Sequence, residues 1–146
     1  MTDSRVLRIK TPEECEQFAK NVEALHPKLA KQARRRAVEL RATKYGANSD
    51  AELEALQAVY AFEAIRSKQT GKKARATQTW QSIQRNGILP TVDKVVARKT
   101  VTESYDALVE AGMEDLTFEG VVQRHHALFS AEAVAQAEAR LREREV

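Results

Sequence analysis

The chain has 146 residues, 42% of them hydrophobic and 31% charged, and its 24 Lys and Arg residues exceed its 21 Asp and Glu residues by a net charge of +3. This length suits one domain with its own core, and the composition excludes a disordered chain. A single cysteine excludes an internal disulfide framework, and no apolar run is long enough to span a bilayer. We therefore expect one cytoplasmic domain over 1–146, with residues 1–10 forming a flexible or loosely attached segment.

Capping signals mark the helices of the first half of the chain. Thr11 and Glu14 form a capping box around Pro12, and Ser49 with Glu52 forms another. Gly46 is a typical helix stop. These signals predict helices over 12–24, 27–44 and 50–67.

The second half of the chain continues the same pattern. Gly87 and Gly112 stop helices, while Thr100 with Glu103, Thr117 and Ser130 are expected to cap them. The expected helices cover 76–86, 90–98, 101–111, 118–126 and 131–141. No segment shows the alternation of a strand. The sequence therefore predicts an all-α compact bundle of roughly eight short helices.

An internal repeat spans two tandem helix-turn-helix-like units, at about 76–99 and 101–126. Trp80, Ile83, Gly87 and Ile88 are echoed 25 residues later by Tyr105, Leu108, Gly112 and Met113. The glycine, the following apolar residue and the later apolar positions resemble the pattern of DNA-binding helix-turn-helix units. However, Ile83 and Leu108 occupy a position where close helix crossing favours Ala. Helical hairpins that only build the core are therefore the favoured interpretation of each unit, and a DNA-reading unit is the alternative.

Charge is strongly segregated along the chain. Residues 26–49 hold seven basic side chains and one acidic one, and residues 66–100 hold nine basic and one acidic. Residues 101–146 hold ten acidic and four basic side chains. Basic stretches with so few interleaved carboxylates are typical of phosphate-binding surfaces. The acidic segments either neutralise them or leave them free, and the sequence does not decide between these alternatives.

The basic positions that we expect to contact nucleic acid lie on the helix after Pro27, in the segment around Gly71 and on the helix after Pro90. They are Lys28, Lys31, Arg34, Arg35, Lys68, Lys72, Lys73, Arg75, Lys94 and Arg98. Trp80 follows the second basic stretch and could stack on a base, but a lone Trp in a small helical domain more often belongs to the core.

Signals for catalysis, metals or cofactors are weak. His125 and His126 are adjacent and point about 100° apart on a helix, so they cannot easily share one ion. Cys15 lies between two glutamates, which raise a thiol pKa and blunt its reactivity. No phosphate-binding glycine loop or nucleophile elbow is present. We expect no catalytic residues, no metal and no cofactor.

The sequence thus predicts a small, bacterial-type, non-enzymatic helical protein that binds nucleic acid, with duplex DNA favoured, mainly through phosphate contacts. Such a protein would act as a regulator or accessory factor. The alternative is a protein-interaction module, an adaptor or antagonist, whose basic face docks an acidic protein. A homodimer packed through the last helix is a further possibility. Nucleic-acid binding requires the separated cations to gather on one uncovered face.

Overall fold

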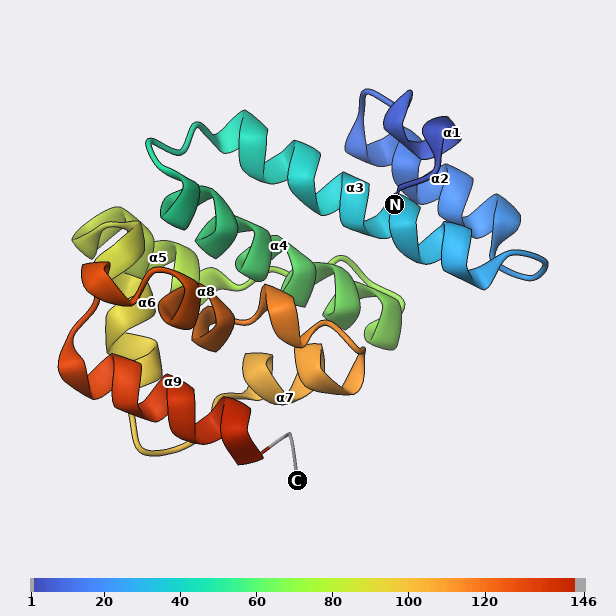
Figure 1. Ribbon diagram of the computed structural model, residues 1–146. Coiled ribbons are helices and arrows are strands. Elements are labelled where there is room, and N and C mark those ends of the chain that lie inside the picture. Colours follow the sequence, from blue (N-terminus) through green and yellow to red (C-terminus); the bar gives the residue numbers. More distant parts are fainter. Residues whose placement is uncertain (1, 144–146) are drawn as a thin grey trace. The chain divides into compact units, whose positions relative to one another are not determined.

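The computed structural model describes residues 2–143, and within them the chain forms nine α-helices, two short 3-10 turns and no strand (Figure 1). The predicted all-α fold is confirmed. The chain divides into two compact units, unit 1 (Met1–Ala47) and unit 2 (Asn48–Val146). Unit 1 holds α1 (Ser4–Leu7), α2 (Pro12–Val22) and α3 (Pro27–Tyr45). Unit 2 holds α4 (Asp50–Thr70), α5 (Thr77–Asn86), α6 (Ile88–Ala97), α7 (Glu103–Glu110), α8 (Phe118–Arg124) and α9 (Ala131–Glu143), with 3-10 turns at Glu114–Leu116 and His126–Leu128.

Unit 1 has a small hydrophobic core, formed mainly where α2 packs against α3. α2 and α3 pack along each other, and small alanines on both helices let them approach closely. The segment that we expected to be loosely attached contains α1, whose Val6 is fully buried in this core. Asp3 N–H donates to Gln32 Oε1 over 2.7 Å, which further ties the segment to α3.

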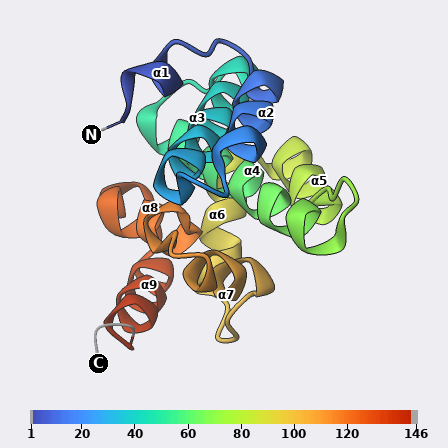
Figure 2. The same ribbon diagram turned by 90° about the vertical axis from the view of Figure 1, so that its right-hand side faces the viewer.

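Unit 2 is organised around α6. This helix packs against α4, α5, α8 and α9 (Figures 1 and 2). Its Val92 and Val96 are almost completely buried, as are Val121 and Val122 of α8. These four valines therefore form part of the core of unit 2.

Most of the predicted capping residues hold the helix starts as expected. Thr11, Ser49, Thr117 and Ser130 accept the hydrogen bonds of Glu14, Glu52, Gly120 and Ala133 backbone N–H groups. The prediction was wrong at α7, because Thr102, not Thr100, accepts from the backbone N–H of Tyr105 over 3.3 Å. Residues 98–102 are held outside the helix by a long-range contact described below.

The two repeated units differ in their turns. Gly87, with φ +93°, is the one residue between α5 and α6. In the second unit Gly112, with φ +73°, closes α7 and a 3-10 turn precedes α8. Both glycines occupy the left-handed half of backbone space, where a side chain is strained. The two units therefore share their glycine positions, but the turns between their helices differ in geometry.

Candidate nucleic-acid interface

The predicted basic surface of α3 is partly neutralised by α2. Lys28 and Lys31 are exposed, whereas Arg34 and Arg35 are half-buried. Arg34 forms an ion pair with Glu23 over 2.9 Å. The exposed cations of α3 are thus Lys28 and Lys31 in its first two turns and Lys44 in its last turn.

Two further arginines of α3 are also paired. Arg41 Nη1 lies 2.6 Å from Glu16 Oε1, and Arg36 Nη1 lies 3.8 Å from Glu39 Oε2. Glu39 is the single acidic residue between positions 26 and 49, so the sequence of α3 alone does not indicate the pairs with Glu16 and Glu23. Glu16 and Glu23 are seven residues apart and so share one face of α2, which is the signal that could have revealed their role.

The basic segment Lys68–Arg75 lies at the end of α4 and in the loop to α5. Lys68, Lys72, Lys73 and Arg75 are all exposed. Arg66, just before them, forms an ion pair with Glu103 at the start of α7. The Arg75 guanidinium lies 5.8 Å from the centre of the Trp80 ring, within reach of a cation–π contact.

Trp80 belongs to the core, and the base-stacking interpretation is wrong. Its side chain is only 7% exposed, and its ring centre lies 5.1 Å from that of Tyr60. Its indole N–H donates to Glu63 Oε2 over 2.7 Å, and the same oxygen accepts from Ala76 N–H over 2.8 Å. Glu63 therefore fixes the beginning of α5 against α4.

The predicted cations of α6 lie on the exposed side of this helix, whose other sides pack against neighbouring helices. Within the bounds of α6, Pro90 and Lys94 are the exposed residues, and Arg98 follows its end. Because α6 contacts four other helices, it does not present a face that could enter a DNA groove. Figure 1 places the end of α4 and the end of α6 at different ends of unit 2. The Lys68–Arg75 segment and Lys94 with Arg98 therefore do not form one cluster there.

Asp93, the single acidic residue between positions 66 and 100, accepts hydrogen bonds from the start of another helix. Its two carboxylate oxygens accept from the Ser130 backbone N–H over 2.6 Å and from Ser130 Oγ over 2.9 Å. These bonds attach the start of α9 to α6. Asp93 is thus committed to the fold and does not neutralise the basic loop.

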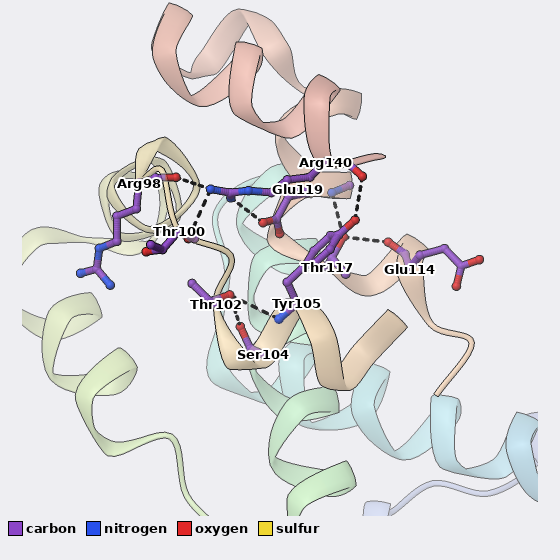
Figure 3. Close-up of polar contacts among 10 residues, drawn as sticks. Arg98, Thr100, Thr102, Ser104, Tyr105, Glu114, Thr117, Glu119 and Arg140 are labelled. Carbon is purple, nitrogen blue, oxygen red and sulfur yellow. Dashed lines mark hydrogen bonds and ion pairs between the residues drawn. The ribbon is translucent and has the colours of Figure 1, made fainter. Parts of the chain in front are cut away.

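A buried ion pair holds the segment that carries Arg98 (Figure 3). Arg140 of α9 and Glu119 of α8 lie 2.8 Å apart, and their side chains are 4% and 2% exposed. Arg140 also donates to the backbone carbonyls of Arg98 and Thr100. In Figure 3 the Arg98 side chain points away from this pair, and the residue is exposed.

The same network extends to α7. The Tyr105 hydroxyl donates to the Arg140 carbonyl over 3.1 Å, and burial raises the pKa of Glu119 despite the opposing hydrogen bond from Arg140. The sequence around Glu119 does not indicate this pair. Its partner lies 21 residues away on another helix, so no local spacing indicates the contact.

The histidines and the cysteine do not gather into a metal-binding group in the part of the chain that the structure describes. No group of three or more His, Cys, Asp or Glu side chains there could hold a metal ion. His125 Nε2 lies 2.6 Å from Glu54 Oε2, and the other oxygen of Glu54 accepts from Arg124. Burial raises the pKa of the Cys15 thiol more than its neighbouring charges do.

Unit 2 also has a small, partly open cavity of about 40 Å³, lined mainly by apolar side chains including Val59, Phe62 and Leu108. This volume is little more than the space of one water molecule, which is about 30 Å³ in the liquid. The cavity is therefore a packing gap and not a substrate pocket.

Across residues 2–143, no helix combines the length and the apolar character needed to cross a membrane. Comparison of the chain with protein-family models, with curated proteins and with solved structures found no match.

Proposed function

We propose that this protein binds nucleic acid, duplex DNA in preference, mainly through phosphate contacts made by the exposed cations of residues 68–75, and acts as a regulator or accessory factor without catalytic activity. One observation carries the proposal. Residues 66–92 hold six cations and no carboxylate, and the next acid, Asp93, is bound by Ser130. An exposed basic segment that contains no carboxylate attracts a polyanion over long range.

Lys28 and Lys31 of α3 are the second expected phosphate contacts. Both are exposed, in contrast to Arg34, which Glu23 neutralises. Gathering of these lysines with the cations of unit 2 on one face stays a prediction. The Lys68–Arg75 segment is the stronger candidate for phosphate contacts, because its lysines precede α5, a helix without acidic residues.

The test is fluorescence anisotropy with labelled duplex and single-stranded DNA over a series of salt concentrations. Wild-type protein should bind, and its affinity should fall linearly with salt on logarithmic axes. Lys72→Gln and Lys73→Gln should each reduce the slope by about 1, uniformly across DNA sequences. Lys20→Gln, at an exposed lysine of α2, is the matched control and should leave binding unchanged.

Two outcomes would contradict the proposal. Failure to bind either form of DNA at low salt would overturn it. Competition by polyglutamate at the same charge concentration as effectively as by DNA would instead favour the alternative, an acidic protein partner.

A further inference from the structure

The outward face of α5 has an unusual composition. Its exposed side chains include Thr77, Gln78, Gln81, Gln84 and Arg85, and none of them forms a hydrogen bond or ion pair with another described residue. Trp80 and Ile83 lie on the opposite side and are buried. At 100° per residue, Gln78, Gln81 and Arg85 fall within a stripe about 60° wide.

Solvation alone does not account for this face. Exposed helix faces usually carry acidic and basic residues that pair at i, i+4 spacing, as α9 does with Glu138 and Arg142 exposed on it. α5 holds no carboxylate at all and one cation, Arg85. Three glutamines therefore occupy exposed positions of α5 where pairs of oppositely charged residues are usual.

Glutamine and arginine are side chains that read base edges. The glutamine amide offers a donor and an acceptor together, which match the N6 and N7 atoms of adenine. The arginine guanidinium matches O6 and N7 of guanine. A helix about 10 Å across fits the major groove, which is about 12 Å wide.

The fold holds α5 firmly and leaves this face outward. Glu63 fixes the start of the helix through Trp80 and Ala76, and Ser82 Oγ lies 2.9 Å from Thr91 Oγ1 of α6. Figure 2 shows α5 at the edge of unit 2, with α4 and α6 on its inner side. A reading helix needs such a rigid support, because base contacts require a fixed register.

The charge around α5 also suits a phosphate backbone. Arg75 lies at its beginning against Trp80, and exposed Lys72 and Lys73 precede it. In the second unit of the repeat, by contrast, the first helix carries exposed Glu103, Asp106 and Glu110. Charge complementarity therefore favours α5 and disfavours α7 as the helix that approaches DNA.

We infer that α5 enters the major groove of duplex DNA, with Gln78, Gln81 and Arg85 contacting base edges while Lys72, Lys73 and Arg75 contact flanking phosphates. This inference rests on the proposed function and adds sequence selectivity to it. It also assigns the reading role to the first helix of the α5–α6 unit. The second helix, α6, is the one that helix-turn-helix proteins use, and here it is packed into the core.

The test begins with selection of preferred duplexes from a random pool by the full-length protein. Anisotropy then compares a selected duplex with a scrambled one at fixed salt. Gln78→Ala, Gln81→Ala and Arg85→Ala should each reduce the preference for the selected duplex by about 5- to 100-fold, the range of one good base contact. Gln78→Ala and Gln81→Ala should leave the salt dependence unchanged. Gln123→Ala, at an exposed glutamine of α8, is the matched control.

The outcomes separate this inference from the proposed function. If neither duplex nor single-stranded DNA binds at low salt, the proposed function itself fails, and if only single strands bind, the reading role of α5 is overturned. If duplexes bind but no sequence is enriched, or if the α5 variants keep the preference of the Gln123→Ala control, then phosphate binding stands and the reading role of α5 is overturned. Circular dichroism of each variant checks that the helices are intact.

Discussion

At the scale of single residues, the buried pair of Glu119 and Arg140 is the most consequential contact in unit 2. Both side chains are out of solvent, and the guanidinium also satisfies two backbone carbonyls. A buried pair contributes little compared with apolar packing, but removing one partner leaves a charge without compensation. The pair therefore matters mainly through the cost of breaking it.

Arg140→Met should lower the free energy of unfolding by about 3–5 kcal/mol, because Glu119 then remains buried alone. Urea denaturation measures this. Arg142→Met, at an exposed arginine of the same helix, should change stability by less than about 0.5 kcal/mol. The double variant Glu119→Leu with Arg140→Met should lose less than the sum of its single changes. Simple additivity would show that the two side chains do not interact.

Gly120 is required by close approach and not by an unusual backbone angle. A Cβ at this position would lie 3.1 Å from the Asp115 carbonyl oxygen and 3.3 Å from that of Glu114. Backbone atoms cannot yield as a flexible side chain does, so Gly120→Ala should lower stability by about 1–3 kcal/mol. Thermal denaturation checks this, with Gln123→Ala in the same helix as reference. An unchanged midpoint would mean that the 3-10 turn shifts at no cost.

Glu54 gives unit 2 a dependence on pH. Burial alone would raise its pKa, but hydrogen bonds from His125 and Arg124 outweigh burial and lower the pKa. A depressed carboxyl pKa stabilises the fold above the usual value of 4.5, and this stabilisation is lost as the pH falls through the lowered value. Glu54→Gln should therefore be less stable than wild type at pH 7, and the difference should shrink below pH 4.5. Urea denaturation midpoints of wild type and Glu54→Gln, measured at pH 7 and below pH 4.5, test this. A difference between the two proteins that stays constant with pH would contradict the lowered pKa of Glu54.

At the scale of elements, one carboxylate fixes the start of α9 on α6. Asp93→Ala removes both acceptors of Ser130 and should cost about 0.5–2 kcal/mol, since the exposed start of α9 loses its hydrogen bonds. Hydrogen exchange should show the largest loss of protection in the first turn of α9. Equal loss over all helices would indicate a different cause. Asp106→Ala, at an exposed acid of α7, controls for the change in charge.

Local signals predicted the elements well and long-range contacts poorly. Thr11, Ser49, Thr117 and Ser130 were found because a cap is a contact between residues three apart. The sequence predicts Thr100 as a cap because Glu103 follows three residues later. In the structure the Thr100 carbonyl instead accepts from Arg140, a contact that crosses 40 residues of sequence. The exposed glutamines of α5 were visible in the sequence, but their shared outward face follows only once Trp80 is known to point inward.

At the scale of the whole molecule, the net charge of +3 conceals an asymmetry in how cations are neutralised. In unit 1 the carboxylates of α2 pair with arginines of α3. In unit 2 the acid-free stretch of residues 66–92 keeps exposed lysines beside Gly71. Composition alone predicts that the basic segments 26–49 and 66–100 are equivalent. The ion pairs distinguish them, because arginines of the first segment pair with carboxylates of the preceding helix and its end.

The two compact units should also differ in their resistance to opening. Unit 1 is less than half the length of unit 2 and has a smaller core. Native-state hydrogen exchange should therefore give amides of α2 and α3 a common opening free energy below that of α6 and α9. One shared value for all four helices would show that the chain opens as a single cooperative body.

Helix ends are the first places to fray, and Arg140 stands near the carboxyl end of α9. Its guanidinium is at the same time the anchor for the carbonyls of Arg98 and Thr100. Unwinding of the final turn of α9 would therefore release a connection more than forty positions earlier, and with it the direction in which the Arg98 side chain leaves the molecule.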